Sequence, residues 1–330
     1  MNKSKRLPVV DSSAILLVFL AAVIVGFFLA DSSFLTASNL NNILLQAAAA
    51  AVAAAAMTYV ILLADIDLSV GSTMNLSLVV AVTLCSTGTQ FDSSTSALVY
   101  PVAIVVGLGL GLLNALLITK LQLNSLIVTL GTMTVYQGIA LLITQAGTSV
   151  TGGAITWLAT TKPGGVSVVV LVGLGIGLLA TWFLKYRQNG RLLYAVGGDP
   201  RSARESGLSQ AKARYIAFGF LGACAAVSGL ITVGQVGSVE ANLGADFAFT
   251  VITAVVIGGT SLFGGRGTVL GSILGAVLLA TIDGGLNMVN ASIYVYDVVR
   301  GAILVLAMLA DAFGTRLSNG RGLRAVQAAR

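Results

Sequence analysis

Residues 185–214, KYRQNGRLLYAVGGDPRSARESGLSQAKAR, form the one long polar interruption in an otherwise apolar chain. The stretch carries seven of the eighteen basic residues against two acids, Asp199 and Glu205. Apolar runs long enough to cross a bilayer flank it on both sides, so we expect an exposed loop on the cytoplasmic face. The seven basic residues are Lys185, Arg187, Arg191, Arg201, Arg204, Lys212 and Arg214.

The middle of this loop predicts a two-turn helix. Asp199 can cap its N-terminus, Pro200 suits the first helical position, and Gly207 can end it in the left-handed conformation. A short capped helix on a basic loop at the membrane face indicates a contact with another protein.

The composition is that of a polytopic membrane protein. Of 330 residues, 56% are hydrophobic and 9% are charged, whereas soluble domains carry about 25% charged residues. The 39 glycines favour close approach between helices, and the alanine-rich run at 46–57 predicts a central helix surrounded by others. Orientation in the membrane explains the net charge of +6 better than nucleic-acid binding does, because no basic groove with interleaved aromatics is present.

The chain lacks the residue types of most catalytic or metal centres. It has no histidine, and Cys85 and Cys224 both lie in apolar runs. The glycine-rich stretch at 258–268 has no lysine and is therefore not a nucleotide loop; it predicts a tight turn at the inner membrane face, anchored by Arg266. We expect neither an enzyme nor a cofactor or metal in this chain.

The apolar runs predict an all-α integral membrane protein with about ten transmembrane helices and cytoplasmic N and C termini. The first run is too long for the core of a signal peptide, so we expect it to remain as the first span. The predicted domains are an N-terminal tail at 1–12, a transmembrane domain at 13–311 that contains the loop 185–214, and a basic C-terminal tail at 312–330. The predicted spans are 13–30, 40–63, 70–86, 98–119, 124–144, 166–184, 215–235, 248–262, 268–289 and 294–311.

Charged residues follow these spans as the positive-inside rule requires. Lys162 is the one basic residue in the outer segments, which otherwise hold Asp31, Asp92, Glu240 and Asp246. The inner segments hold Lys3, Lys5, Arg6, Lys120, the seven bases of the loop, Arg266, Arg316, Arg321, Arg324 and Arg330.

A weak internal sequence similarity links ADIDLSVGSTMNLS (64–77) with GGTSLFGGRGTVLG (258–271). Both segments are expected as turns between a downward and an upward span, which is the parity of a repeated half, with chance as the alternative. Glycine pairs such as Gly107 with Gly111 are expected to be helix contacts rather than sites.

Few ionisable residues lie near the predicted spans. Asp65 and Asp67 are the acids nearest a membrane-embedded turn, where an ionisable group is costly. They either line a polar path, or Asp67 or Ser69 caps the third span. Asp297 and Arg300 lie three residues apart on one helical face and are expected to neutralise each other.

Neutral hydrogen-bonding side chains are more numerous in and beside the apolar helices. Amides and hydroxyls suit an uncharged polyol or sugar, although each of them could instead join two helices. The candidates for a polar path, besides the two acids, are Asn75, Asn114, Asn124, Ser125, Thr129, Thr132, Gln137 and Asn287.

Five motifs, spread in order over residues 40–311, resemble the permease subunit of bacterial ABC importers for monosaccharides, of the ribose, xylose, arabinose and galactoside type. The motifs are IDLSVGS (66–72), IVTLGTM (127–133), YAVGGDPRSARESGL (194–208), AVVIGGTSLFGGRGTVLG (254–271) and VVRGAILVLAML (298–309). The chain departs from the family pattern at Ala64 and Asp65, where two glycines are usual, and at ADFAFTVIT (245–253), where an acidic stretch is common.

The resemblance implies a multi-pass protein of the bacterial inner membrane that works as a dimer with a second copy or a paralogue. It also implies a cytoplasmic ABC ATPase, which holds the ATP and magnesium, and a periplasmic or lipid-anchored sugar-binding protein that delivers a monosaccharide. It assigns the contact with the ATPase to Gly198, Asp199, Pro200, Arg201, Ala203, Arg204, Glu205 and Gly207.

The expected function is therefore import of a monosaccharide or a sugar-like solute, with ATP hydrolysis on separate subunits. One alternative is a secondary transporter driven by an ion gradient, which would need buried acids in the core of the bundle. The other is the same machine carrying a sugar-derived signal or a polyol. The identity of the solute and the choice between a homodimer and a heterodimer stay open.

Overall fold

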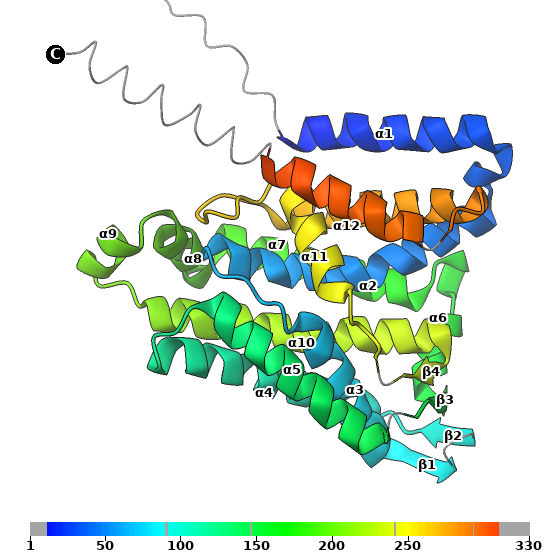
Figure 1. Cartoon of the computed structure of the whole chain (residues 1–330), viewed down its shortest axis with the longest axis horizontal. Coiled ribbons are helices and arrows are strands. Elements are labelled where there is room, and N and C mark those ends of the chain that lie inside the picture. The colour runs from blue at the N-terminus through cyan, green and yellow to red at the C-terminus, as the bar shows by residue number, and fades with distance from the viewer. Residues whose placement is uncertain (1–11, 90–91, 146, 241, 293, 310–330) are drawn as a thin grey trace, which may run out of the picture.

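The computed structural model describes residues 12–89, 92–145, 147–240, 242–292 and 294–309. Nearly all of the two predicted tails lies outside these residues. Helices dominate the fold (Figure 1), and one of them spans most of each of the ten ranges predicted as spans. They are α1 (Ser12–Ala30), α2 (Ala37–Leu62), α3 (Val70–Cys85), α4 (Val99–Lys120), α5 (Ser125–Thr144), α7 (Val168–Tyr186), α10 (Gln210–Val236), α11 (Phe247–Ile257), α12 (Val269–Met288) and a last helix over 294–309.

Six of these helices are long and apolar enough to cross a membrane: α2, α4, α5, α7, α10 and α12. The helix α11 is shorter than predicted, because it ends at Ile257 and not near residue 262. Gly259 there has φ of 83°, a left-handed conformation that breaks the helix.

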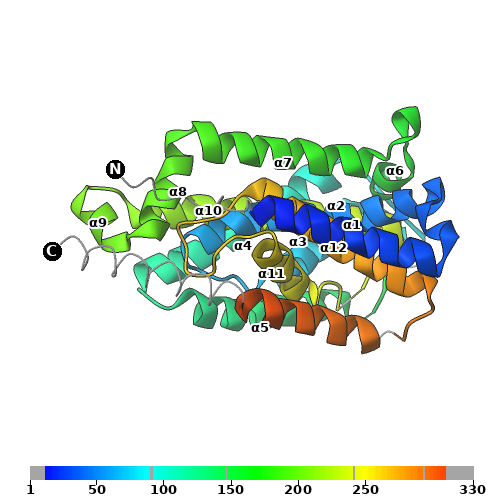
Figure 2. The same ribbon diagram turned by 90° about the horizontal axis from the view of Figure 1, so that it is seen from above.

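The alanine-rich helix α2 lies at the centre of the bundle, as the sequence predicts. Ala53 to Ala56 are fully buried, and α2 packs against α12, α10, α7 and α11. Near its C-terminal end, α2 forms hydrogen bonds with two neighbouring helices. Tyr59 Oη donates to the carbonyl of Ala180 in α7 (2.8 Å), and Thr58 Oγ1 donates to Ser272 Oγ in α12 (2.7 Å). Figure 2 shows α7 on one side of this centre and the last helix on the other.

Glycines bring α4 and α10 into backbone contact. A Cβ atom on Gly107 would lie 2.4 Å from the carbonyl oxygen of Gly222, and one on Gly111 would lie 2.2 Å from that of Phe218. Such approach is possible only where no side chain intervenes. The prediction that these glycines are helix contacts is confirmed.

The bundle has two different ends, which we call the α9 end and the strand end. At the α9 end, α7 is followed by α8 (Gln188–Gly198) and α9 (Pro200–Glu205). At the strand end, four short strands form one sheet in the order β1–β2–β3–β4. They are β1 (Ser86–Thr89), β2 (Asp92–Thr95), β3 (Ser149–Gly153) and β4 (Ser238–Val239), with the short helices η1 (Ser32–Leu35), α6 (Ala154–Thr160) and η2 (Pro163–Gly165) nearby.

At the strand end, the all-α bundle also carries a small sheet that the sequence did not predict. The β1–β2 and β3–β4 pairs are antiparallel and the β2–β3 pair is parallel. These strands are short connections rich in Ser, Thr and Gly, without the alternating apolar pattern of a strand. They pair because the helices bring their ends together.

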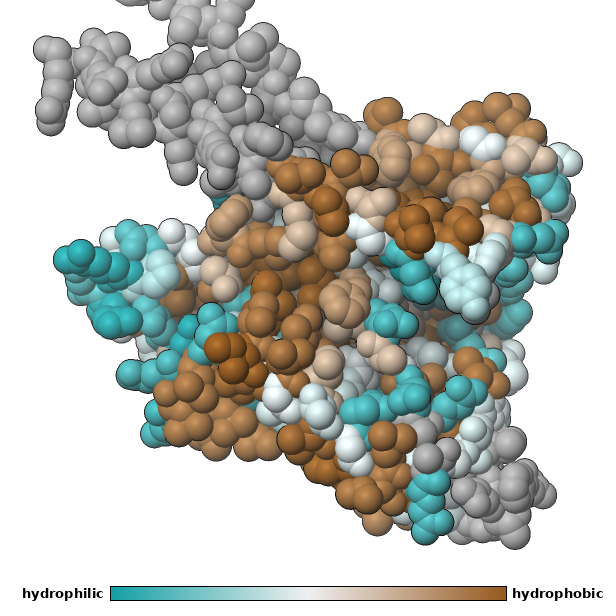
Figure 3. All heavy atoms as spheres, viewed as in Figure 1, coloured by the Kyte–Doolittle hydropathy of each residue, from teal (hydrophilic) through white to brown (hydrophobic). Residues whose placement is uncertain are grey.

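The surface has the polarity of a membrane protein. On the face seen in Figure 3, apolar residues form a broad band across the middle of the bundle, and hydrophilic residues gather at α9. Large apolar side chains such as Leu142, Leu179 and Val105 are well exposed on α5, α7 and α4. Apolar exposure of this extent fits lipid contact.

Candidate functional site

The capped helix predicted in the basic loop is α9. Asp199 Oδ1 accepts hydrogen bonds from the backbone N–H groups of Arg201 and Ser202, both at 3.0 Å, and Oδ2 accepts one from Ser202 Oγ at 2.5 Å. The Ser202 side chain and backbone hold the pKa of Asp199 below its usual value. Pro200 is the first residue of the helix, and Gly207 follows it with φ of 76°, so the predicted cap and stop are confirmed.

The helix α9 buries one residue and presents its charges to solvent. Ala203 is buried, whereas the side chain of Arg201 is 90% exposed and pairs with Glu205 over 3.1 Å. Arg204 contacts Gln210 over 3.3 Å. An exposed pair of this kind adds little to stability.

The sequence did not predict α8, which occupies the first part of the loop. Its signal was the amphipathic run RLLYAV, in which Leu192, Leu193 and Val196 are buried on one face. The loop 185–214 is therefore mostly helical, with a break at Asp199 between α8 and α9.

The last turn of α8 sits directly on the backbone of α2 and of the turn 258–268. Gly265 N donates a hydrogen bond to the carbonyl of Leu62 (2.9 Å), and a Cβ atom on Gly197 would lie 1.7 Å from that same oxygen. Tyr194 Oη also donates to the carbonyl of Gly267 (2.8 Å). We call the contact of Leu62, Gly197 and Gly265 the glycine junction.

The glycine-rich stretch 258–268 is a tight turn, as predicted. Gly259, Gly264, Gly265 and Gly267 all have positive φ. The segment 64–77, which shows the weak internal similarity, includes the turn between α2 and α3. That turn contacts the turn 258–268 at the glycine junction. The two turns differ in length, so a single sequence offset does not superpose the two helix pairs.

The turn between α2 and α3 contains a buried ion pair. Asp65 Oδ2 lies 2.8 Å from Nε of Arg214, with 7% and 31% of the two side chains exposed. Arg214 lies near the start of α10, the helix that follows α9 in the chain. The preceding residue, Ala64, has φ of 58°, a conformation that favours the glycine found in the resembling family.

Asp67 is buried beside the ion pair and is satisfied by its neighbours. Its Oδ1 accepts from Ser69 N (2.7 Å) and Ser69 Oγ (2.6 Å), and Asn114 Nδ2 donates to Ser69 Oγ (2.7 Å). Tyr136 Oη donates in turn to Asn114 Oδ1 (3.1 Å). Ser69 stands at the start of α3 but makes no side-chain cap.

Two more predicted polar residues hold the same turn. Ser125 Oγ accepts from the N–H of Ile66 (3.3 Å), and Thr129 Oγ1 accepts from that of Leu68 (3.1 Å). The structure therefore brings Asp65, Asp67, Asn114, Ser125 and Thr129 together around the turn 63–69.

The remaining predicted residues are scattered. Asn124 caps α5 through Leu126 N, and Thr132 Oγ1 donates to the carbonyl of Thr129 in the same helix. Asn75 is fully buried in α3. Gln137 donates to Asn242 at the strand end (2.8 Å), and Asn287 lines a cavity there.

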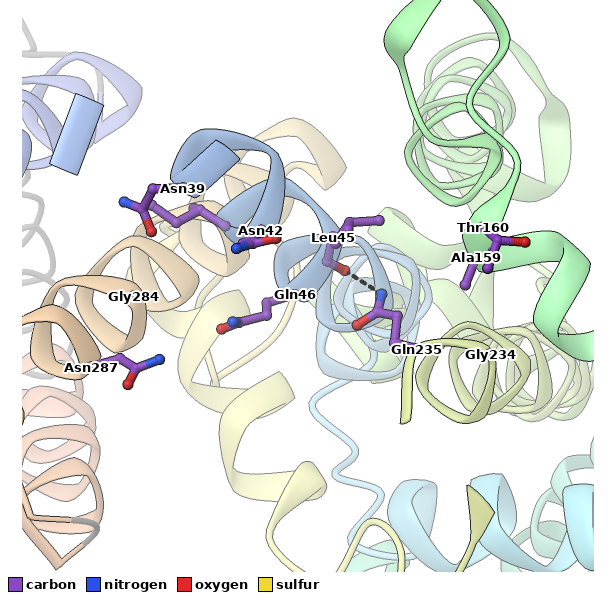
Figure 4. Close-up of a pocket in the computed structure, with 11 residues that line it drawn as sticks. Asn39, Asn42, Leu45, Gln46, Ala159, Thr160, Gly234, Gln235, Gly284 and Asn287 are labelled. Carbon is purple, nitrogen blue, oxygen red and sulfur yellow. Dashed lines mark hydrogen bonds between the residues drawn. The ribbon is translucent and has the colours of Figure 1, made fainter. Parts of the chain in front are cut away.

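A cavity of about 360 Å³ opens at the strand end, between α2, α6, α10 and α12. Five carboxamide side chains line it (Figure 4). Gln235 Nε2 donates to the carbonyl of Leu45 (2.8 Å) and Asn39 to that of Phe34 (2.8 Å). Within the described part of the chain, the other three make no hydrogen bond. The five are Asn39, Asn42, Gln46, Gln235 and Asn287.

Four of these carboxamides were not among the predicted residues. Their signal was available, because Asn39, Asn42 and Gln46 are spaced three and four residues apart and so share one face of α2. The sequence around Gln235 does not show that this residue lines the same cavity, because α10 meets α2 only in the folded bundle.

A second cavity of about 460 Å³ adjoins the first and shares Gln46 and Gln235 with it. Its charged lining residues are Glu240, Asp246, Asp283 and Arg300. Arg300 Nη2 lies 2.6 Å from Asp283 Oδ2. The predicted pairing of Arg300 with Asp297 was wrong. Asp283 lies on the facing helix α12, and residue spacing within one helix cannot reveal a partner on another helix.

These features define a class of protein. Apolar helices long enough to span a bilayer, a polar cavity at one end and a basic capped helix at the other belong to a membrane transport subunit. Among the described residues, no group of three or more His, Cys, Asp and Glu side chains could hold a metal ion.

The family of permease components of the branched-chain amino acid transport system matches residues 39–308, and the chain belongs to this family. The ribose import permease protein RbsC of Escherichia coli strain K12 is 33% identical over 77% of this chain and 79% of that protein. The D-allose transport system permease protein AlsC of the same strain is 34% identical over 77% of each chain.

The autoinducer 2 import system permease protein LsrD of Klebsiella pneumoniae is also 34% identical over 77% of each chain. No solved structure matches the chain. The resemblance found in the sequence is thereby confirmed, and the chain is a multi-pass permease subunit of the inner membrane, a transport component.

Proposed function

We propose that this chain is the permease subunit of an ATP-driven ABC importer for a monosaccharide or a sugar-like solute. The ribose and allose permeases among its relatives support the cargo class. The exposed, capped and basic helix α9 is the observation that carries the coupling to an ATPase. The relative that imports autoinducer 2 makes a sugar-derived signal the second candidate cargo.

In this proposal the α9 end faces the cytoplasm, and ten helices cross the membrane between cytoplasmic termini. Lys120 ends α4 at the α9 end, and Arg266 lies in the turn before α12 at the same end. Asp31 and Glu240 lie at the strand end. This distribution agrees with the positive-inside rule.

The helix α9 docks into a cytoplasmic ABC ATPase, which holds the ATP and magnesium. Closure of the ATPase pair moves α9, and α8 carries the movement to the glycine junction. Because Gly197 and Gly265 meet Leu62 of α2 through backbone atoms alone, no flexible side chain absorbs the displacement. The push then switches access between the two sides of the membrane.

The solute enters from the strand end, where a sugar-binding protein docks. Free carboxamides of Asn42, Gln46 and Asn287 offer donors and acceptors without charge, which suits sugar hydroxyls. Among the predicted path residues, Asn287 lines this entrance, and the cluster around Asp67 holds the turn at the cytoplasmic end of the path. A second copy or a paralogue completes the dimer.

The experiment is Arg201→Glu combined with Arg204→Glu, tested in the complete importer reconstituted in proteoliposomes. Association with the ATPase and uptake of ribose are both expected to fall at least tenfold, while membrane insertion persists. The matched control is Arg191→Glu with Lys212→Glu, which changes the same net charge outside α9. Normal uptake in the first variant, or equal loss in the control, would refute docking by α9.

A further inference from the structure

The ion pair in the second cavity joins two helices, α12 and the last helix, which also pack together through Leu278, Ile282, Val299 and Ile303. Asp283 belongs to α12 and Arg300 to the last helix, and their side chains are 15% and 30% exposed. Both residues line the cavity, together with Gln46 and Gln235. The pair is therefore neither a surface contact nor sealed in the core.

Arg300 retains an unused donor. Its Nη2 atom binds Asp283, but Nε is buried and has no hydrogen-bond partner among the described residues. A guanidinium offers five N–H donors in a fixed planar fork, and a buried donor without a partner is unfavourable. Because Nε is enclosed, a ligand in the cavity meets the outer N–H groups of the guanidinium first, and its oxygen reaches Nε only if the side chain turns toward the cavity.

The charge of the lining limits the ligand. Glu240, Asp246 and Asp283 face one base, Arg300, so the cavity has an excess of negative charge. An anionic solute would meet repulsion there. An uncharged polyol would not, and its hydroxyls can donate to Asp283 while another of its oxygens accepts from Arg300.

We propose that Asp283 and Arg300 form a solute-binding pair within a single copy of the chain, which favours uncharged polyhydroxylated solutes over anionic ones. The carboxylate accepts a hydrogen bond from one hydroxyl, and the outer N–H groups of the Arg300 guanidinium donate to a neighbouring hydroxyl or ring oxygen. This inference rests on the proposed importer function and adds the residues that determine its specificity.

The test measures ribose uptake and ATP hydrolysis together in proteoliposomes that contain the permease, its ATPase and its binding protein. The variants are Arg300→Gln and the double variant Asp283→Asn with Arg300→Gln, which leaves no unpaired charge. Asp297→Asn is the control, since it removes a charge one turn away on the same helix. Uptake should fall at least tenfold in both variants, so that the ATP hydrolysed per ribose imported rises at least tenfold, and the control should match the wild type.

A purely structural pair gives different results. If Asp283 and Arg300 only fasten the last helix to α12, the uncharged double variant should import ribose nearly as well as the wild type. Alternatively, uptake and ATP hydrolysis should fall in equal proportion. Either result overturns the inference while leaving the importer function intact. A wild-type complex that imports no pentose or hexose, ribose and allose included, and no autoinducer 2 overturns the proposed function itself, and the inference with it.

Discussion

The α9 end of the bundle is closely packed, whereas the strand end contains cavities lined by polar side chains. At the α9 end, glycine backbones touch at the glycine junction, and the polar groups of the turn 63–69 are bonded to α4, α5 and α10. At the strand end, two adjoining cavities remain, and the side-chain amides of Asn42, Gln46 and Asn287 make no hydrogen bond within the described residues. A closely packed contact can transmit a displacement because its atoms have no empty space to move into. Binding of a solute instead requires empty space and hydrogen-bonding groups without protein partners.

The largest effect is expected at the glycine junction. Gly197→Ala would place a Cβ atom 1.7 Å from the carbonyl oxygen of Leu62, so α8 must move away from α2. We expect a loss of about 3 kcal/mol in the free energy of unfolding, because overpacking against backbone cannot relax through a side chain. Thermal unfolding in detergent would measure it.

The neighbouring glycine supplies the control. A Cβ atom on Gly198 would have no heavy atom within 4 Å, so Gly198→Ala should keep the melting temperature of the wild type. Equal melting temperatures for the two variants would show that the junction is not rigid.

The ion pair of the same end comes next. Arg214→Ala leaves the carboxylate of Asp65, the more buried partner, without a counter-ion, and should cost about 3 kcal/mol. Asp65→Ala leaves a partly exposed guanidinium and should cost less, about 2 kcal/mol, because solvent screens it.

The double variant Asp65→Ala with Arg214→Ala tests whether the pair acts as a unit. It should lose less stability than the sum of the two single variants, as measured by a double-mutant cycle. Simple additivity would mean that the two charges do not depend on one another.

At the strand end, substitutions of the polar side chains should lower solute uptake while leaving stability nearly unchanged. Asn42→Ala, Gln46→Ala and Asn287→Ala remove side chains without protein partners, so stability should change by no more than about 0.5 kcal/mol. Uptake of ribose should fall about fivefold in each, because a lost hydrogen bond to the solute contributes about 1 kcal/mol. A variant that melts early without losing uptake would contradict the contrast between the ends.

One substitution is expected to raise stability. Ala64→Gly relieves the positive φ of 58° in the turn beside Asp65 and should raise stability by about 1 kcal/mol. Ala195→Gly, at an exposed position inside α8, should instead lower stability by about 0.5–1 kcal/mol. A loss at both positions would mean that the turn is not strained.

Much of the fold could be predicted because its signals are local. The length of each apolar run predicts a helix, and the Asp199–Pro200 pair followed by Gly207 predicts the start and end of α9. What failed were partners supplied by another helix. Arg300 was paired with Asp297 on its own helix, although Asp283 on α12 is its partner, and the carboxamide Gln235 gave no sign that it faces Gln46.

By itself, the sequence determined that the chain enters a membrane, roughly where its long helices lie, and which loop carries the capped helix α9. These properties depend on the free energy of short segments, through burial of apolar side chains and capping of nearby backbone groups. Only the tertiary structure decided which polar groups are used and which stay free. A cavity is the space left between helices from distant parts of the chain, and its lining depends on how they pack.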